Sequence, residues 1–250
     1  MPAVVIIPAR YASTRLPGKL LKPGPAGKCV LEYVCAAAQR ARSIARVIVA
    51  TDDERILRVA QAAGVEARMT SPTHTCGTDR IAEVAATLDA DIVVNAQADE
   101  PQLRPEMIDQ TVRLLEEDAE CVMSTLAHEI DAEEEFADPN VVKVVVDGRG
   151  RALYFSRCPI PYVRDSQRPA ADCPVRPLHH IGIYGYRRAF LLQYSRLPKA
   201  GIEQAEKLEQ LRALFHGYAI RVGVTPYRMI GVDTPKDFAA FCDAVAKEMK

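Results

Sequence analysis

The sequence predicts an α/β fold with a parallel sheet, helices on both faces of the sheet, and an inserted antiparallel lobe. Runs of Val and Ile, typical of strands buried on both faces, alternate with helical segments as far as Ala96. After about residue 120 the spacing changes, and two apolar runs flank a glycine-containing turn. We therefore expect a single domain over residues 1–250, with the antiparallel lobe at roughly residues 130–190.

The first half of the chain supplies the predicted parallel strands and the helices between them. We expect strands at Ala3–Pro8, Val47–Thr51, Val65–Met69 and Ile92–Ala96, and helices at Val30–Ala41, from Asp52 or Asp53 to Ala63, and at Asp79–Leu88. Gly64 is expected to end the second helix, because glycine is common just beyond a helix C-terminus. Sheets of this kind bind ligands at the carboxyl ends of their strands. The loops after Pro8, Thr51 and Ala96 are therefore the expected site.

The second half is predicted to contain a hairpin, a long loop and a closing helix. We expect strands at Val141–Val146, Ala152–Phe155, Ile181–Tyr186 and Ile220–Val224, and helices at Glu203–Phe215 and Pro235–Glu248. The segment 147–150 (DGRG) favours a hairpin turn between the first two strands. The segment from Ser156 to Pro177 is rich in proline and arginine and is expected to form a long functional loop. One apolar face is expected on the Glu203–Phe215 helix, formed by Leu208, Leu211, Leu214 and Phe215.

Composition and charge argue against several classes of protein. The chain has 250 residues, of which 48% are hydrophobic and 26% charged, as in ordinary globular proteins. A formal net charge of -1 gives no global reason to bind a nucleic acid or an anionic membrane. The apolar run Val4–Ile7 is too short for a signal sequence, and no stretch approaches the ~20 apolar residues of a membrane span. The 7 cysteines lack zinc-like spacing, so we expect reduced thiols in a cytoplasmic protein.

A cationic loop follows the first predicted strand. The segment PARYASTRLPGK carries Arg10, Arg15 and Lys19, and no acidic residue occurs before Glu32. A triphosphate carries about four negative charges, and a loop at the carboxyl end of a strand offers both cations and backbone amides to it. The loop follows neither the GxxxxGK[ST] nor the GxGxxG pattern. From charge and position, polyphosphate binding and an ordinary exposed cationic loop are about equally favoured.

Two aspartates are candidate ligands of a cation. Asp99 lies in the segment NAQADEP at the end of a predicted strand, and Asp233 lies in GVDTP before a predicted helix. Mg²⁺ prefers carboxylate oxygens in proteins, so the two side chains would form a magnesium site if they converged. An isolated aspartate more often caps a helix or stabilises a turn. The sequence leaves the convergence of the two side chains open.

Other polar segments border the long loop or the predicted helices. CGTDR opens a helix, YFSR ends at Arg157, and HHIGIYGYR contains His179, His180 and Tyr184. Neighbouring histidines on a strand point to opposite faces, so we do not expect His179 and His180 to chelate one metal together. The pair 209–210 (EQ) flanks an apolar helix face, where a solvated position is the more common role.

Seven segments together resemble one family: PARYASTRLPGK, CGTDR, NAQADEP, KVVVDGRGRALYFSR, HIGIYGYR, LEQLR and GVDTP. In this order, and over nearly the whole chain, they are similar to the 3-deoxy-D-manno-octulosonate (Kdo) cytidylyltransferases, also called CMP-Kdo synthetases. The resemblance implies a Rossmann-like nucleotidyltransferase fold with an antiparallel dimerisation lobe, and a homodimer. It also implies a magnesium-dependent reaction in which CTP and Kdo give CMP-Kdo and pyrophosphate for lipopolysaccharide synthesis.

The resemblance further implies roles for individual residues. The implied catalytic residues are Arg10, Lys19, Asp99 and Asp233, with both aspartates as magnesium ligands. The implied nucleotide-binding residues are Pro8, Ala9, Arg10, Ser13, Arg15, Lys19, Gly77 and Arg80. The implied sugar-binding residues are Arg80, Gln97, Arg157, His180, Tyr184, Glu209 and Gln210. Arg157 is expected to hold the sugar carboxylate through two parallel hydrogen bonds, and no residue is assigned as general base.

The chain departs from the family's pattern at three positions. Ala98 stands where glycine is usual, which would strain the backbone by about 1 kcal/mol or more if its φ is positive. His179 replaces an arginine, and Cys76 replaces a serine. Because the magnesium and triphosphate residues are intact, the nearest rival hypothesis is CMP transfer to another acidic sugar, of the amino-Kdo or sialic acid type. Less favoured hypotheses are a glycosyltransferase that uses CMP-sugars and a non-catalytic nucleotide-binding protein.

Overall fold

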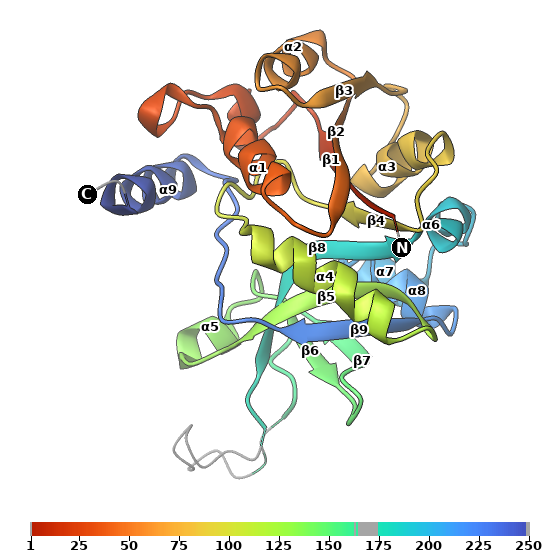
Figure 1. Cartoon of the computed structure of the whole chain (residues 1–250). Coiled ribbons are helices and arrows are strands. Elements are labelled where there is room, and N and C mark those ends of the chain that lie inside the picture. Colours follow the sequence, from red (N-terminus) through yellow and green to blue (C-terminus); the bar gives the residue numbers. More distant parts are fainter. Residues whose placement is uncertain (1, 163, 165–174, 249–250) are drawn as a thin grey trace.

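The computed structural model describes residues 2–162, 164 and 175–248, which fold around one mixed β-sheet (Figure 1). The strands are β1 (Ala3–Ala9), β2 (Ile44–Thr51), β3 (Glu66–Met69), β4 (Ile92–Asn95), β5 (Cys121–Glu129), β6 (Lys143–Val146), β7 (Ala152–Ser156), β8 (Leu178–Arg187) and β9 (Ala219–Val224). Within the described residues, the order in the sheet is β3-β2-β1-β4-β8-β5-β9. β6 pairs with β8, and β7 pairs with β6.

The first four strands are parallel, as the sequence predicts. β1 pairs with β2 and β4, and β2 pairs with β3, all in the parallel sense. In this register Ala9 lies beside Thr51, and Ile6 lies beside Asn95. Parallel strands end at the same edge of a sheet, so the segments that follow β1 and β4 leave the sheet together. This edge carries the cationic loop and the segment with Asp99.

The long strand β8 changes the direction of the sheet. It runs antiparallel to both β4 and β5, whereas β9 is parallel to β5. β6 and β7 form the predicted hairpin, in which the backbone N–H of Gly150 (φ +73°) donates to the carbonyl of Asp147. Lys143 of β6 then pairs with His179 of β8. The sheet is therefore mixed, with antiparallel pairs that involve β4 to β8.

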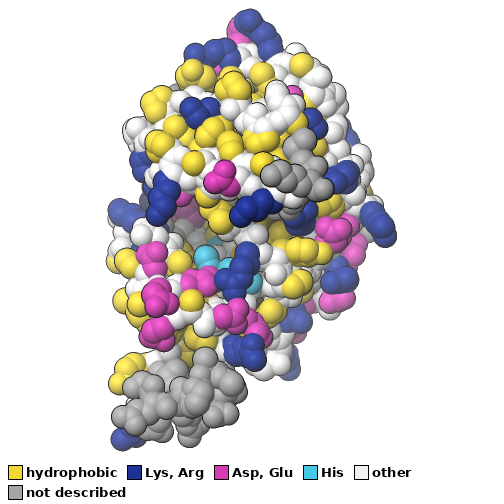
Figure 2. All heavy atoms as spheres, turned by 90° about the vertical axis from the view of Figure 1, so that its left-hand side faces the viewer, with side chains coloured by type: hydrophobic (Ala, Val, Ile, Leu, Met, Phe, Trp, Pro, Cys, Tyr) yellow, Lys and Arg dark blue, Asp and Glu magenta, His cyan; other side chains and the backbone are white. Residues whose placement is uncertain are grey.

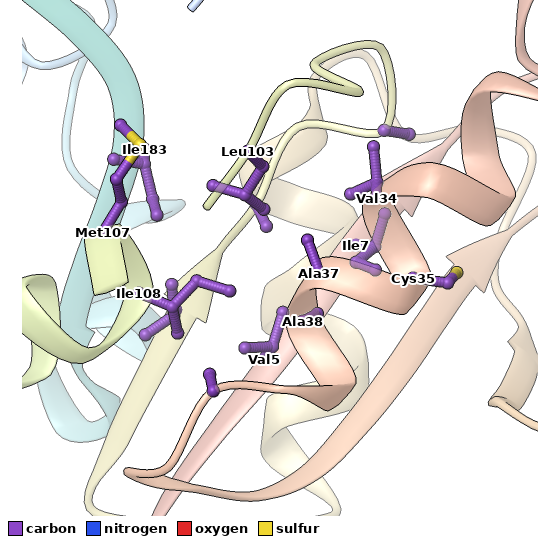
Figure 3. Packing of buried hydrophobic residues seen from close by; sticks show 14 of the residues in the cluster. Val5, Ile7, Val34, Cys35, Ala37, Ala38, Leu103, Met107, Ile108 and Ile183 are labelled. Carbon is purple, nitrogen blue, oxygen red and sulfur yellow. The ribbon is translucent and has the colours of Figure 1, made fainter. Parts of the chain in front are cut away.

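Helices cover both faces of the sheet. They are α1 (Val30–Gln39), α2 (Glu54–Ala62), α3 (Gly77–Ala86), α4 (Pro105–Glu117), α5 (Glu133–Ala137), α6 (Arg188–Tyr194), α7 (Gly201–Glu206), α8 (Leu211–Phe215) and α9 (Pro235–Glu248), with 3-10 turns at Lys19–Leu21 and Pro25–Gly27. One face of the sheet, to which Val5 and Ile7 of β1 point, is covered by α1, α4 and α9. Figure 3 shows how α1 packs against β1 and α4 on this face. α3, α6 and α8 pack on the other face, against Val4 and Ile6. This alternation follows from the two-residue period of a strand.

Several elements differ from the prediction. The helix expected at Glu203–Phe215 is wrong, because Lys207 adopts left-handed backbone angles (φ 55°, ψ 45°) and separates α7 from α8. Phe215, expected on the apolar face of that helix, is 60% exposed. The sequence reasoning did not identify α4, β5 or α6. Part of the predicted long loop, residues 163 and 165–174, lies outside the described residues.

None of the helices in the described ranges has the length and apolar character that a bilayer span requires.

Candidate active site

The two candidate aspartates converge on one lysine. Lys19 Nζ lies 2.5 Å from Asp99 Oδ2 and 2.8 Å from Asp233 Oδ1. Gly18 precedes Lys19 with a positive φ of 65°, which glycine adopts without strain, and so turns the chain into the short 3-10 helix that presents the lysine. Burial alone would lower the pKa of Lys19, but the two carboxylates outweigh it and raise this pKa above its ordinary value of 10.5. Lys19 therefore stays protonated between two carboxylates.

The Asp233 carboxylate is free to pair with Lys19 because Thr234, and not Asp233, caps the last helix, α9. Thr234 Oγ1 accepts the backbone N–H of Asp237, and Asp237 Oδ2 accepts the N–H groups of Asp233 and Thr234. This reciprocal arrangement satisfies the start of α9 without the Asp233 carboxylate. The backbone N–H of Val232 also donates to the carbonyl of Asp99 at 2.8 Å, which joins the two segments. Thr234 therefore has the helix-capping role that the sequence left open for Asp233.

Glu100, which the sequence reasoning did not single out, is a third carboxyl group at this site. Burial, together with the nearby Asp99 and Asp233, raises the pKa of Glu100 to about 8. Its Oε2 atom is buried and has no hydrogen-bond partner. Three carboxyl groups around one lysine, with an unsatisfied buried oxygen among them, are suited to a divalent cation that prefers oxygen ligands. The donor set therefore fits Mg²⁺.

The cationic loop lies beside these carboxylates. Arg15 forms an ion pair with Asp233 (Nη2 to Oδ2, 2.9 Å), and its side chain is 65% exposed. Arg10 donates from Nη2 to the carbonyl of His74 at 3.1 Å. Ser13 Oγ accepts the backbone N–H of Leu16 and stabilises the turn of the loop. Three cationic side chains of the predicted phosphate loop, including Lys19, are thus held near the end of β1.

The remaining nucleotide-site predictions concern the start of the loop and of α3. Ala9 is fully buried as the last residue of β1. Pro8 lies against the first turn of α3, where a Cβ added to Gly77 would come within 3.4 Å of the proline ring. Gly77 therefore permits a close approach between the start of α3 and the end of β1.

A cavity of about 350 Å³ lies at the end of β4, where Asn95 and Gln97 line it (Figure 2 shows the hollow, with histidine side chains in its wall). Five predicted sugar-binding residues line it: Gln97, His180, Tyr184, Glu209 and Gln210. Gln97 lies two residues before Asp99, so the segment after β4 contributes to both places. Glu100 Oε1 would lie 3.1 Å from a Cβ added to Gly182, another lining residue. The cavity and the carboxylates are therefore neighbours.

His180 is held in a single hydrogen-bonding state. The hydroxyl of Thr125 donates to a backbone carbonyl of β8, so it accepts from His180 Nε2 at 3.0 Å. Burial lowers the pKa of His180 to about 3, which keeps the ring neutral and leaves Nδ1 as an acceptor. Tyr184 lies beside it, with ring centroids 5.4 Å apart, and burial raises the pKa of its hydroxyl. Both side chains offer neutral, fixed polar groups.

The connection between α7 and α8 supplies the other wall. Glu209 Oε2 accepts a hydrogen bond from Thr78 Oγ1 at 2.9 Å. Gln210 is 4% exposed, and its Nε2 donor has no partner. An unsatisfied buried donor costs about 1–3 kcal/mol, so a ligand oxygen that accepts from it would be bound favourably. Gln210 is the strongest local indication that the cavity binds a polar ligand.

Two predicted arginines do not line this cavity. Arg80 is fully buried and donates to Thr70 Oγ1 and to Asp52 Oδ2, the latter at 2.6 Å. Arg157 donates from Nε to the carbonyl of Glu206 at 2.7 Å and from Nη1 to that of Pro139 at 3.0 Å. Neither residue is among those that line the cavity, and both guanidinium groups donate to other parts of the protein, although Arg80 Nε is buried without a partner.

Lys207 is the cation that the sequence reasoning missed. Among the described residues that line the cavity, it is the only lysine or arginine. Its left-handed conformation ends α7 and directs the chain into the segment with Glu209 and Gln210. No sequence signal marked it, because the prediction placed it inside a continuous helix.

Comparison with known proteins places the chain in a family. A family model described as cytidylyltransferase matches residues 4–220. The 3-deoxy-manno-octulosonate cytidylyltransferase of Geotalea uraniireducens is 48% identical over 252 residues, which cover 99% of this chain and 100% of that protein. The corresponding protein of Geobacter metallireducens is 50% identical over 242 residues, 95% of each. The chain belongs to the 3-deoxy-manno-octulosonate cytidylyltransferase family.

Solved structures agree with this family. A structure of CMP:2-keto-3-deoxy-manno-octonic acid synthetase complexed with CTP has a TM-score of 0.92 and 43% identity, covering 99% of this chain and 100% of that one. A 4-diphosphocytidyl-2C-methyl-D-erythritol synthase from Anaerococcus prevotii shares the fold, with a TM-score of 0.63 at 14% identity. The predicted α/β nucleotidyltransferase fold is confirmed.

The three departures from the family's pattern have local explanations. Among the described residues, Ala26 and Lys207 are the non-glycine residues with positive φ, so Ala98 does not carry the strain considered for it. Cys76 occupies the N-cap of α3, where its Sγ accepts the backbone N–H of Asp79 at 3.4 Å. His179 Nδ1 lies 2.8 Å from Glu135 Oε1, and burial lowers the pKa of this histidine despite that carboxylate. Each substitution is thus accommodated within the family's fold.

Proposed function

We propose that this protein transfers CMP from CTP to Kdo and releases pyrophosphate, as the names of its relatives indicate for them. The observation that carries the proposal is that Asp99 and Asp233 both form ion pairs with Lys19. The neighbouring cavity is lined by Gln210, whose amide nitrogen has no hydrogen-bond partner. The first group of residues is suited to a metal-bound triphosphate, and the cavity is suited to a hydroxyl-rich acid. A nucleotidyltransferase needs both in contact.

The nucleotide end of the site acts by position and charge. Arg10, Arg15 and Lys19 neutralise the triphosphate and stabilise the charge that develops on the departing pyrophosphate. Asp99 and Asp233 would hold Mg²⁺, which supplies charge neutralisation and lowers the pKa of a coordinated hydroxyl group. The sugar hydroxyl attacks the α-phosphorus and loses its proton to solvent, the bond to the bridging oxygen breaks, and pyrophosphate leaves in line. No covalent intermediate with the protein is required.

The acceptor end of the site recognises a sugar acid through fixed polar groups. Gln210 Nε2 donates to a sugar hydroxyl, and His180 Nδ1 accepts from another. Lys207 forms an ion pair with the carboxylate, the role that the resemblance assigned to Arg157. A lysine without a planar fork binds the carboxylate as a point charge rather than through two parallel bonds. The affinity for the sugar acid therefore depends on the charge of Lys207, and the orientation of the sugar depends on its hydrogen bonds to Gln210 and His180.

The cellular setting follows from the acceptor. We propose that Kdo activation by this enzyme serves lipopolysaccharide synthesis and takes place in the cytoplasm, beside the two small-molecule substrates. We infer a homodimer that associates through the antiparallel lobe of β6, β7 and β8. Light scattering at working concentration tests this assignment, and a monomer mass would contradict it.

A panel of acceptors tests the substrate assignment. CTP and Mg²⁺ are supplied with equal concentrations of Kdo, an amino-Kdo and a sialic acid, and the CMP-sugar products are identified by mass spectrometry. We expect CMP-Kdo as the main product. Activity confined to a sugar other than Kdo would overturn the acceptor, and hydrolysis of CMP-sugars without pyrophosphate release from CTP would overturn the reaction.

A further inference from the structure

Three side chains of types that can bind a metal, His128, Glu135 and His179, meet in the antiparallel part of the sheet, apart from Asp99 and Asp233. One ligand atom from each of His128, Glu135 and His179 lies within 4.8 Å of the other two. His128 of β5 and His179 of β8 are directly opposite in the strand register, so they point to the same face. Glu135 comes from α5, which lies against that face. The cluster thus joins three separate elements.

The distances within the cluster are close to those of a tetrahedral metal site. Glu135 Oε1 lies 2.8 Å from His179 Nδ1 and 3.6 Å from His128 Nε2. The two imidazole rings have centroids 4.6 Å apart. Ligand atoms at 2.0–2.1 Å from a tetrahedral zinc ion are separated by about 3.3 Å. Small side-chain movements would therefore place all three atoms around one ion.

A backbone contact fixes the orientation of His128. Its Nδ1 lies 3.0 Å from the carbonyl oxygen of Glu129, which only accepts, so Nδ1 carries the proton. Nε2 then faces the carboxylate of Glu135, whose Oε1 lies 3.6 Å away. A carbonyl that holds the second nitrogen of a histidine is the usual support of a metal-binding imidazole.

The carboxylate is oriented in the same way. Arg228 Nη1 binds Glu135 Oε2 at 3.1 Å, and its Nη2 binds Asp131 Oδ2 at 2.7 Å. The other oxygen, Oε1, is thereby turned towards both histidines. The side chains of His128, Glu135 and His179 are 5%, 18% and 24% exposed, so the cluster is most open at His179. His179 also lines the cavity of about 350 Å³ described above.

We propose that His128, Glu135 and His179 bind one divalent transition-metal ion of the zinc type, with an open coordination position towards the cavity. Imidazole and carboxylate together suit Zn²⁺, Fe²⁺ or Ni²⁺, whereas Mg²⁺ prefers oxygen ligands alone. Three protein ligands with a fourth position open is a common arrangement for such ions. The site is separate from Asp99 and Asp233 and does not depend on the proposed reaction.

Direct zinc binding tests the proposal. The full-length protein is stripped with a chelator and dialysed against Zn²⁺ in an excess of Mg²⁺, which competes for the carboxylates at Asp99 and Asp233. We expect one tightly bound zinc per chain. Glu135→Gln and His179→Gln should each weaken binding by about 100-fold or more, since loss of even an outer-shell partner costs 10–100-fold. His216→Gln, at a histidine that contacts the Pro198 carbonyl, should leave binding unchanged.

Cobalt replaces zinc as a spectroscopic probe of the ligands. Co²⁺ in the proposed site should give visible absorption bands without the strong near-ultraviolet band of a thiolate, because the cluster has no cysteine. The proposal is wrong if the two ligand variants bind as much zinc as the wild type, if the wild type binds none, or if the thiolate band appears. Glu135→Gln preserves the shape of the side chain, so it decides the question if His179→Gln does not fold.

Discussion

Replacement of Glu203 by alanine should destabilise the protein strongly, because it leaves a buried arginine without its carboxylate. Arg212 Nε and Nη2 lie 2.9 Å and 2.5 Å from the two oxygens of Glu203, and both side chains are less than 10% exposed. Without Glu203, the guanidinium retains a weak contact to the Tyr194 carbonyl at 3.5 Å and the face of the Tyr194 ring at 4.8 Å. Neither contact compensates a buried charge.

The size of the effect follows from burial. Removal of one partner from a buried ion pair costs about 3–5 kcal/mol, a large part of the 5–15 kcal/mol that typically separates folded from unfolded protein. The double variant Glu203→Leu/Arg212→Met removes both charges and should recover part of the loss. The backbone N–H of Ala200, which donates to Glu203 Oε2 at 3.1 Å, loses its acceptor in both variants. The exposed pair Glu54–Arg58 is the matched control, since Glu54→Ala should cost less than about 0.5 kcal/mol.

Urea unfolding followed by circular dichroism measures these differences. Burial alone would raise the pKa of Glu203, but the bonds from Arg212 outweigh it and hold this pKa below its ordinary value. The contribution of the pair is therefore fully present above a pH of about 4.3, the ordinary glutamate pKa, and is lost as the pH falls through the lower folded-state pKa. A loss for Glu203→Ala no larger than that for Glu54→Ala would refute the reasoning.

Three further predictions concern the site. Asp99→Asn should lower kcat about 10²–10³-fold without a change in the unfolding midpoint. The control Asp89→Asn, at an exposed position, should leave kcat intact. Equal kcat values for the two variants would remove Asp99 from the mechanism. Lys207→Met should raise the KM for the sugar acid about 10- to 100-fold in steady-state kinetics and leave the KM for CTP unchanged. A higher KM for CTP with an unchanged KM for the sugar acid would contradict the proposed contact between Lys207 and the sugar carboxylate. Burial lowers the pKa of His180 to about 3. The unfolded chain therefore binds an extra proton below pH 6.5. From pH 7 to pH 5 the wild type should lose about 2 kcal/mol more unfolding free energy than His180→Gln, as measured by urea titrations. If the unfolding free energies of the two proteins fell in parallel over this range, the prediction would be wrong.

The parallel part of the fold could be predicted because its signals are local. The apolar strands at the start of the chain need no knowledge of their neighbours, and Gly64 ends the second helix with a positive φ. The break at Lys207 could not be predicted, since nothing in its type favours left-handed backbone angles. The helix α4 had a visible signal, with buried Met107, Ile108 and Leu115 at helical spacing, that the sequence reasoning did not use.

The site shows the same division between local and long-range information. The types of residue that bind phosphate and metal were evident from Lys19, Asp99 and Asp233, but their convergence depends on contacts over 80 or more positions. The alternation of strand side chains explains why His179 and His180 have different partners. The position of His128 opposite His179 depends on the β5–β8 register, which the sequence alone does not reveal.

Pyrophosphate release from CTP tests the central claim most directly. The protein is supplied with CTP and Mg²⁺, with and without Kdo, and the pyrophosphate is measured by a coupled assay. We predict release only when Kdo and Mg²⁺ are both present, in equal amount to the CMP-Kdo formed. An absence of release with Kdo, from protein that still binds CTP, would contradict the account.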